Sequence, residues 1–210
     1  MARQTEPKDL WTEERRIFAQ RGDILLCGVD EAGAGPLAGP VYAAAVILPR
    51  ELVLPGLDDS KKLTERRREL LFPQIKEQAV AWAVATASPE EIDELNILNA
   101  RMLAMDRAIA QLEPKADFAL IDGNCCRGIR CPCETLVKGD SRSASIAAAS
   151  ILAKVSRDHY MEEVARVYPQ YQFEKHKGYP TKLHYALLAQ YGPSPIHRQS
   201  FLKKFYGQKS

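Results

Sequence analysis

Short apolar runs alternate with longer amphipathic stretches along the chain, and the spacing within each indicates its secondary structure. Compact apolar runs bounded by turn residues are typical of buried strands. Stretches with apolar residues three and four positions apart are typical of helices that pack by one face. Strands are predicted at residues 24–30, 41–48, 80–87 and 117–122, and helices at residues 64–77, 89–95, 97–112, 145–166, 180–190 and 197–206.

The order of these elements indicates the fold class. Strands come first and long helices follow, which predicts an α/β fold with a mixed central sheet flanked by helices and a helical C-terminal portion. The chain has 210 residues and is 46% hydrophobic, so it can bury one sizeable core, and we expect a single domain over residues 1–210. Ser88 and Glu91 flank Pro89 in a pattern that predicts a capped helix start.

Acidic residues follow two of the predicted strands where each strand ends. Asp30 and Glu31 come at the end of the first run, and Asp122 follows residues 118–121. A buried carboxylate has a large desolvation cost unless a cation offsets it, so this position favours a metal site. Asp-Glu beside glycine is also ordinary turn chemistry, and this alternative stays open. If the two strands are neighbours with aligned ends, Asp30 and Asp122 converge.

A further acid interrupts the apolar face of a predicted helix. The face that contains Ala147, Ile151 and Val155 continues at helical spacing through Asp158. A salt bridge from Asp158 to Lys154, one turn earlier, is the simpler explanation. A metal ligand is the alternative that would explain this acid together with those at the strand ends.

Taken together, these acids describe an all-oxygen metal site. The four are Asp30, Glu31, Asp122 and Asp158. With no His or Cys to complete the set, they suit a hard divalent cation, Mg²⁺ or Mn²⁺, rather than zinc. Four carboxylates can hold two ions, and two ions about 4 Å apart can activate water and stabilise the leaving oxygen of a phosphodiester. The acids therefore predict two-metal phosphodiester hydrolysis.

The net charge is only +2, but its distribution is uneven. Residues 175–210 contain seven Lys or Arg and no Asp or Glu, which makes them a basic helical C-terminal portion. Such an end suits a nucleic acid substrate because cations hold phosphates, although a solvated helix end is the alternative. No signal peptide and no apolar run of membrane-spanning length is visible, so we expect a cytoplasmic protein without membrane contact.

Four of the five cysteines lie close together in the sequence. They are Cys125, Cys126, Cys131 and Cys133. Structural zinc sites usually take two separated pairs with two to four residues between ligands, and this spacing fits that pattern poorly. We expect reduced loop cysteines, with a metal site or a disulfide as the alternatives.

Several ordered motifs make the chain similar to bacterial ribonuclease HII, the type 2 ribonuclease H, over about residues 24–205. The similar stretches are residues 28–33 (GVDEAG), 36–41 (PLAGPV), 59–63 (DSKKL), 138–140 (KGD), 147–155 (AAASILAKV), 157–158 (RD), 176–179 (HKGY) and 195–198 (PIHR). The resemblance implies a ribonuclease H-like fold. It also implies an endonuclease that hydrolyses the RNA strand of RNA/DNA hybrids. Such an enzyme would nick 5′ of single ribonucleotides embedded in duplex DNA, leaving 3′-hydroxyl and 5′-phosphate ends.

The resemblance also implies roles for individual residues. Its metal ligands correspond to Asp30, Glu31, Asp122 and Asp158, and Asp140 is the alternative for the fourth. A carboxylate in a turn, as Asp140 is, needs no metal to explain it. Two ions, Mn²⁺ or Mg²⁺, would be the cofactors.

Substrate contacts follow from the same resemblance. The loop that senses the ribose 2′-hydroxyl corresponds to Gly33, Ala34 and Gly35, and the tyrosine that stacks on the sugar at the RNA-to-DNA junction corresponds to Tyr179. Further candidates for phosphate contacts are Ser60, Lys61 and Lys177, for which a solvated loop is the alternative.

The chain departs from the family pattern at one position, where Ala34 stands between two glycines in place of the usual Arg. Backbone amides survive that change, and a 2′-hydroxyl can be read by backbone groups. A hybrid-binding protein with impaired catalysis is therefore the alternative function. A second alternative is another two-metal enzyme, a strand-transferase or junction resolvase, that cuts DNA without needing ribose.

The last predicted helix also has the spacing of a sliding-clamp peptide. In residues 199–206, Gln199 is followed by Leu202 three positions on and then by the paired aromatics Phe205 and Tyr206. Such peptides insert apolar anchors of a short helical turn into a hydrophobic pocket. The alternative is that the same side chains pack a terminal helix onto the core. Apart from its substrate and this clamp candidate, we expect the chain to act as a monomer.

Overall fold

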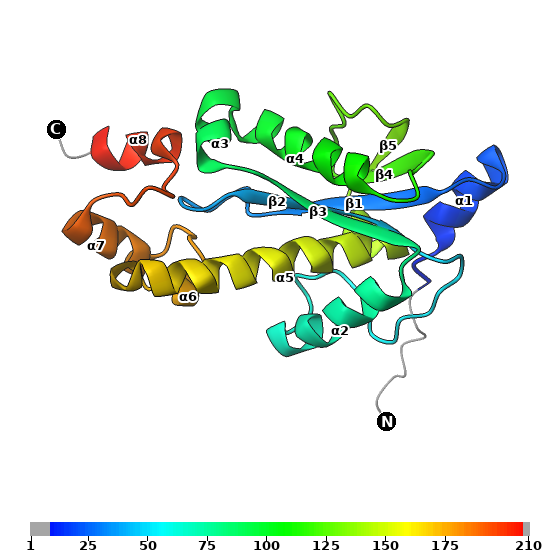
Figure 1. Cartoon of the computed structure of the whole chain (residues 1–210), viewed down its shortest axis with the longest axis horizontal. Coiled ribbons are helices and arrows are strands. Elements are labelled where there is room, and N and C mark those ends of the chain that lie inside the picture. Colours follow the sequence, from blue (N-terminus) through cyan, green and yellow to red (C-terminus); the bar gives the residue numbers. More distant parts are fainter. Residues whose placement is uncertain (1–8, 208–210) are drawn as a thin grey trace.

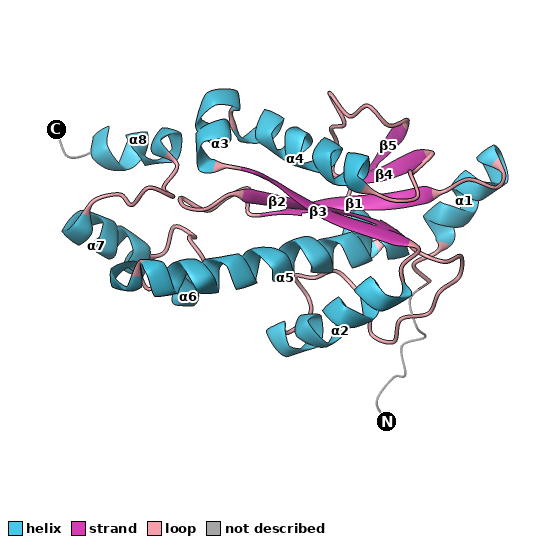
Figure 2. Cartoon of the chain, in the orientation of Figure 1, coloured by secondary structure: helices cyan, strands magenta, loops and turns pink. Residues whose placement is uncertain are grey.

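The computed structural model describes residues 9–207, apart from the side chains of residues 204–206. Its centre is a five-stranded sheet in the order β3-β2-β1-β4-β5 (Figure 2). The strands are β1 (Leu26–Ala32), β2 (Val41–Ile47), β3 (Ala81–Ala87), β4 (Phe118–Asp122) and β5 (Cys133–Leu136). Strands β1, β2 and β3 pair antiparallel, whereas β4 pairs parallel with both β1 and β5. The sheet is therefore mixed, as the sequence predicts.

Helices cover both faces of this sheet. The helical elements are α1 (Thr12–Arg21), α2 (Glu65–Gln78), α3 (Pro89–Leu95), α4 (Ile97–Gln111), the 3₁₀ turn η1 (Gly139–Ser141), α5 (Ala144–Val167), the 3₁₀ turn η2 (Pro169–Tyr171), α6 (Phe173–His176), α7 (Lys182–Tyr191) and α8 (Gln199–Gly207). Figure 1 shows α3 and α4 on one side of the sheet and α2 and α5 on the other, with α7 and α8 at one end. No helix among residues 9–207 is long and apolar enough to span a membrane.

Small residues let α5 lie close to the sheet. Its buried face is rich in alanine and packs with Ala44 and Val46 of β2. Gly28 of β1 is the closest approach, because a Cβ there would overlap the backbone of Ser145 and Ile146. The start of α5, and the turn η1 just before it, are thereby fixed against the middle of β1.

The predicted elements are confirmed with small changes at their ends, including the capping box of Ser88 and Glu91 at the start of α3. Helix α1, strand β5 and the short helix α6 were not predicted. Helix α1 is rich in charge and buries only Glu14 and Ile17, so it carries no clear apolar stripe. Strand β5 begins at Cys133, the last of the clustered cysteines, and has only four residues, too few for a period to show.

Candidate active site

The pairing of β1 with β4 brings the two acids at the strand ends together. The strands are parallel neighbours, and Val29 of β1 lies opposite Ile121 of β4. One residue further along each strand, Asp30 and Asp122 are neighbours at the point where β4 ends. Alternation along β1 places Asp30 on the same face as Gly28, which packs against α5. The predicted convergence of Asp30 and Asp122 is confirmed.

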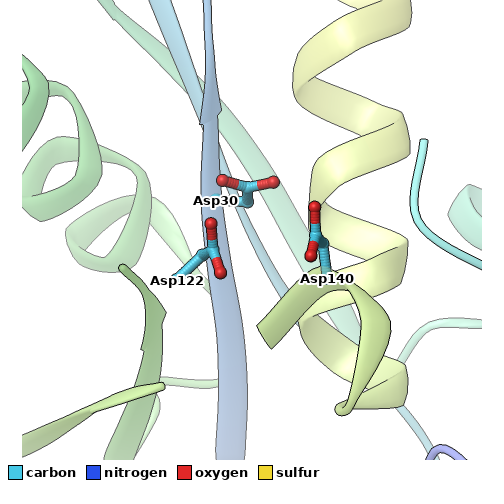
Figure 3. A group of neighbouring side chains, drawn as sticks. All are labelled: Asp30, Asp122 and Asp140. Atoms are coloured by element: carbon cyan, nitrogen blue, oxygen red, sulfur yellow. The ribbon is translucent and has the colours of Figure 1, made fainter. Parts of the chain in front are cut away.

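A third carboxylate completes the group from another part of the chain. Asp140 lies in η1, and one oxygen from each of Asp30, Asp122 and Asp140 lies within 4.8 Å of the others. Figure 3 shows the three side chains pointing toward one another from β1, β4 and the turn before α5. The Gly139 N–H donates a 2.7 Å hydrogen bond to Asp122 Oδ1, which ties η1 to the end of β4.

Two of these carboxylates, Asp30 and Asp140, lie where burial disfavours their charge. Burial, followed by the charges of Glu31 and Asp122, raises the pKa of Asp30 well above its usual value. Burial also raises the pKa of Asp140, and Lys61, whose Nζ donates to Asp140 Oδ2 at 3.2 Å, opposes that rise. Divalent cations would relieve the repulsion, and a set of carboxylate oxygens without nitrogen or sulfur ligands suits hard ions.

Glu31 is not one of the three residues whose carboxylate oxygens converge, but its charge acts on Asp30 and the charge of Asp122 acts on it. Adjacent residues of a strand face opposite sides of the sheet, and Glu31 faces α4, where Arg101 Nη2 lies 2.6 Å from Glu31 Oε1. Its other oxygen, Oε2, is buried and has no hydrogen-bond partner in the described part of the chain. Burial raises the pKa of Glu31, while Arg101 lowers it. One oxygen of Glu31 thus remains available to a cation.

Asp158, which the sequence predicts as the fourth ligand, does not join the acidic group formed by the described residues. Its Oδ1 accepts a 2.6 Å hydrogen bond from Lys154 Nζ, which is the salt bridge considered as the simpler alternative. The reason is geometric: η1 directly precedes α5, whereas Asp158 lies about four helical turns after the start of α5. Asp140, the sequence alternative, takes the position beside Asp30 and Asp122.

Comparison with known proteins identifies the family. The family model described as Ribonuclease HII matches residues 27–204. The chain belongs to the ribonuclease HII family. It is 59% identical over 177 residues to ribonuclease HII of Dechloromonas aromatica, covering 84% of this chain and 90% of that protein. It is 56% identical over 189 residues to ribonuclease HII of Vibrio campbellii, covering 89% of each.

Solved structures share the fold. The crystal structure of ribonuclease H2 from Pyrococcus horikoshii matches with a TM-score of 0.69 at 28% identity, covering 83% of this chain and 92% of that chain. Ribonuclease HII from Archaeoglobus fulgidus, solved in complex with PCNA, matches with a TM-score of 0.71 at 26% identity, covering 84% and 94%. The family consists of metal-dependent endoribonucleases, so the chain is a hydrolase that cuts the RNA strand of RNA/DNA hybrids with divalent metal.

Two buried arginines hold the loop between β1 and β2. Arg198 is fully buried, and its guanidinium donates to the carbonyl oxygens of Gly33 at 2.6 Å, Ala34 at 3.0 Å and Gly39 at 2.9 Å. Arg157, also fully buried, donates to the carbonyls of Ala38 at 3.1 Å and Pro40 at 3.3 Å. The loop therefore keeps its shape through its backbone carbonyls and does not depend on the side chain at position 34.

Tyr179 lies at the other side of this loop. Its side chain is exposed, and the Arg157 guanidinium carbon lies 5.7 Å from the ring centroid. Arg157 Nη1 also donates to the Lys177 carbonyl at 3.0 Å, and the Leu37 N–H donates to the Gly178 carbonyl at 2.8 Å. These contacts connect the segment that carries Tyr179 to the loop after β1, so the two candidate substrate readers share one support.

Two buried histidines, His184 and His197, fix the backbone of Tyr179 through hydrogen bonds. They were not among the predicted site residues. His184 Nδ1 lies 3.0 Å from the Tyr179 carbonyl and must donate, since a carbonyl only accepts. His184 Nε2 then accepts from His197 Nε2 at 3.0 Å, and His197 Nδ1 accepts from the Ser194 N–H at 2.8 Å. Burial lowers the pKa of His184 and of His197 to about 4, which keeps both rings neutral in these roles.

The remaining candidates for phosphate contacts, Ser60, Lys61 and Lys177, differ in exposure and in hydrogen-bond partners. Ser60 is buried and accepts a 2.5 Å hydrogen bond from Ser150 Oγ, so its side chain serves packing between the loop before α2 and helix α5. Lys61 has a mostly exposed side chain beside Asp140. Lys177 Nζ donates to Glu162 Oε1 at 2.7 Å. Lys61 lies at the surface near the acids, whereas the largely buried Lys177 lies two residues before Tyr179.

The cysteines lie apart from the acidic group. Cys125, Cys126, Cys131 and Cys133 are free thiols, partly buried at the edge of the core on the α4 side of the sheet. Burial, and next the neighbouring Cys126, raise the pKa of Cys133 to about 12, so this thiol is protonated. A protonated thiol is a poor nucleophile and a poor metal ligand.

Proposed function

We propose that the chain hydrolyses RNA in RNA/DNA hybrids and also nicks duplex DNA on the 5′ side of a single embedded ribonucleotide. The products would carry 3′-hydroxyl and 5′-phosphate ends. The observation that supports this most is the convergence of Asp30, Asp122 and Asp140, because Asp30 comes only three residues before Gly33, in a loop with a fixed backbone. Such an arrangement places candidate metal ligands beside a candidate ribose reader.

We assign the metal site to four acids, of which Asp30 and Glu31 are adjacent in β1 and lie on opposite faces of that strand. Asp30, Asp122 and Asp140 would hold divalent ions between them, and Glu31 would contribute its unpaired Oε2. Their all-oxygen donor set fits Mg²⁺ or Mn²⁺. Two such ions, when bound, would lower the pKa of the attacking water and stabilise the leaving 3′ oxygen. In this assignment the buried Asp158 pairs with Lys154 rather than with the ions.

Recognition of ribose would come from backbone groups and one aromatic ring. The carbonyls of Gly33 and Ala34 are turned toward Arg198, which sets the planes of their peptide groups. Fixed backbone groups of the loop 33–35 can then hydrogen-bond a 2′-hydroxyl, which can act as donor and acceptor. The exposed ring of Tyr179 would stack on the sugar at the junction, and Lys61 and Lys177 would contact phosphates.

The alternative of a hybrid-binding protein with impaired catalysis rests on Ala34, and the loop geometry argues against it. Arg198 and Arg157 shape the loop without any contribution from the side chain at position 34. Loss of a guanidinium there removes a phosphate contact, but it leaves the carboxylates and the loop backbone in place. We therefore propose an active enzyme with weakened phosphate attraction at this loop.

Three duplexes of one sequence test this function: an RNA/DNA hybrid, a DNA duplex with one ribonucleotide, and an all-DNA duplex. Each is incubated with Mn²⁺, with Mg²⁺ or with a chelator. We expect metal-dependent cleavage of the first two, with a nick 5′ of the ribonucleotide in the second. Cleavage of the all-DNA duplex would favour the strand-transferase or resolvase alternative. Binding of the hybrid without turnover would favour the impaired protein.

The sliding clamp, which the sequence suggests as a partner through α8, has less support. The Archaeoglobus fulgidus protein was solved with PCNA, but in this chain Leu202 is buried in one cluster with Leu37 and Leu188. Asp93 also accepts hydrogen bonds from the first turn of α8, through the N–H groups of Gln199 and Ser200. These contacts favour packing over clamp binding. A pull-down with the host clamp, with the full chain and with a chain that lacks residues 199–210, tests this.

We further propose that the chain is a cytoplasmic monomer. Light scattering measures the molar mass in solution and thereby tests the monomeric state.

A further inference from the structure

Helix α1 lies before the region that the family model matches, which starts at residue 27. It nevertheless docks against the segment that carries Asp140. Figure 1 shows α1 beyond the end of the sheet. Its residues Glu13 and Glu14 both reach residues 142–145, at the junction of η1 and α5. An appended helix thus touches the part of the chain that supplies one candidate metal ligand.

Glu14 makes the central contact. Its side chain is buried, and its Oε1 accepts hydrogen bonds from Ser143 Oγ at 2.6 Å, from Ser145 Oγ at 2.7 Å and from the Ser145 N–H at 3.0 Å. A carboxylate at the N-terminus of a helix satisfies amide groups that lack partners within the helix and complements the helix dipole. Three hydrogen bonds on one oxygen fix the start of α5 relative to α1.

Two further contacts support the same junction. Arg142 Nη2 forms an ion pair with Glu13, and the Ala144 N–H donates a 2.9 Å hydrogen bond to the Leu10 carbonyl. The segment 142–145 is therefore held by the backbone of Leu10, before α1, and by the side chains of Glu13 and Glu14, within α1.

The junction leads directly to Asp140. The N–H groups of Arg142 and Ser143 each donate a 2.8 Å hydrogen bond to the Gly139 carbonyl, which closes the turn η1 around Asp140. The Gly139 N–H in turn donates to Asp122 Oδ1. A shift of Ser143 would move this turn, and the carboxylate of Asp140 with it, relative to Asp30 and Asp122.

We propose that Glu14 is a positioning residue for the metal site: by fixing Ser143 and Ser145 at the start of α5, it sets the place of Asp140 in the acidic group. The proposal rests on the proposed function in one respect, namely that Asp140 is a metal ligand. A purely structural role of Glu14 would lower the stability of the chain and leave the affinity for metal unchanged. The two roles therefore differ in a binding measurement.

The test is calorimetric titration of Mn²⁺ into the metal-free protein, without substrate, at a temperature where circular dichroism shows each variant folded. Glu14→Ala is expected to bind Mn²⁺ about 10–100-fold more weakly, the range typical of residues that support metal ligands. Glu14→Gln keeps an acceptor oxygen for the serines and should restore binding to within a few-fold of wild type. In cleavage assays Glu14→Ala should raise the Mn²⁺ concentration needed for half-maximal rate more than it lowers the rate at saturation.

Two further variants separate the outcomes. Arg15→Ala is the matched control, because Arg15 forms ion pairs only with the exposed Asp9 and Glu51 among the described contacts of α1, and its Mn²⁺ affinity should stay at the wild-type value. Asp140→Asn must weaken Mn²⁺ binding. If it does not, the assignment of Asp140, and with it the proposed metal site, fails. If Asp140→Asn weakens binding while folded Glu14→Ala binds Mn²⁺ as wild type does, the positioning role is overturned. Should Glu14→Ala not fold, Glu14→Asp, shorter by one methylene, decides by the same comparison.

Discussion

Arg198 Nη2 donates a 2.6 Å hydrogen bond to the carbonyl oxygen of Gly33, across 165 residues of sequence. The same guanidinium reaches the next carbonyl, that of Ala34, through Nη1. Two consecutive peptide groups are thus oriented by one buried side chain. Burial lowers the pKa of Arg198 to about 9, so it remains charged at neutral pH and can keep these donors in place. The proposed ribose reader is therefore shaped from the C-terminal part of the chain.

Arg198→Lys should lower kcat/KM for a duplex with one embedded ribonucleotide. Lysine keeps the charge but cannot donate to two neighbouring carbonyls with a fixed planar fork. A displacement of about 1 Å at a substrate-positioning loop can reduce the rate by about 10²-fold. Steady-state kinetics on this duplex measure the effect.

The matched control is Arg107→Lys. Arg107 also makes a two-pronged contact, with both oxygens of Glu91, but on the surface beside α3. It should leave the kinetics unchanged. An Arg198→Lys variant with wild-type kcat/KM would show that the loop does not need its guanidinium.

Substitutions of Asp140 and of Asp158 should have opposite effects on cleavage. Asp140→Asn should reduce metal-dependent cleavage by orders of magnitude, because an amide cannot supply the anionic oxygen that holds a divalent ion. Asp158→Asn should retain most activity, because it loses only the ion pair with Lys154 on the same helix. Cleavage rates at saturating Mn²⁺ compare the two. If Asp158→Asn lost most of its cleavage activity while Asp140→Asn stayed active, the fourth ligand would be Asp158 rather than Asp140.

The sequence is sufficient for the part of this site that depends on local pattern. Asp30 and Asp122 each follow an apolar run of strand length, and parallel pairing of those strands is enough to bring them together. Asp140 has no such signal, because a carboxylate in a Lys-Gly-Asp turn is explained without metal. Only the tertiary position of η1 beside β4 distinguishes it. Asp158 interrupted an apolar stripe, but the local alternative, Lys154, explains it.

The support of the loop is the part that a single sequence does not reveal. Arg157 and Arg198 are held by backbone carbonyls rather than by acidic side chains, and most of these carbonyls lie more than a hundred residues away. Buried arginine is uncommon, and nothing in a pattern of residue types marks a carbonyl as its partner. Likewise, Glu14 lies in a charge-rich segment and is buried only because α1 docks on the start of α5. Such contacts follow from the fold and not from periodicity.

Ala34→Arg should strengthen the interaction with the substrate. Ala34 is partly exposed, so the loop has room for a longer side chain at this position. An added guanidinium can contact a phosphate, and each added contact makes the logarithm of the affinity fall more steeply with the logarithm of salt concentration. Binding of the embedded-ribonucleotide duplex, measured from about 50 to 200 mM salt in the absence of cleavage, tests this. Unchanged affinity and slope would mean that position 34 does not face the nucleic acid.

Asp30→Asn should stabilise the metal-free protein while abolishing cleavage. In the folded chain, burial and the charges of Glu31 and Asp122 raise the pKa of Asp30 well above the value of about 3.9 of an unfolded chain. The folded state thus binds the proton more tightly, so stability is lost as pH rises from the unfolded pKa through the folded one. Asparagine has no such loss, and its carbonyl oxygen can still accept from the Glu31 N–H, as Asp30 Oδ1 does.

Thermal unfolding of both proteins in the presence of a chelator, from about pH 4 to pH 8, measures this difference. The two unfolding temperatures should be close at the acid end, and that of Asp30→Asn should be higher at neutral pH, by roughly 2–4 °C for each kcal/mol. Groups that do not interact with Asp30 titrate alike in both proteins, so their contributions cancel in the comparison. Addition of Mn²⁺ should reverse the order, since ligand binding to the folded state stabilises only the protein that retains the site. A variant that unfolds below wild type at neutral pH without metal would show that Asp30 is not held against its charge.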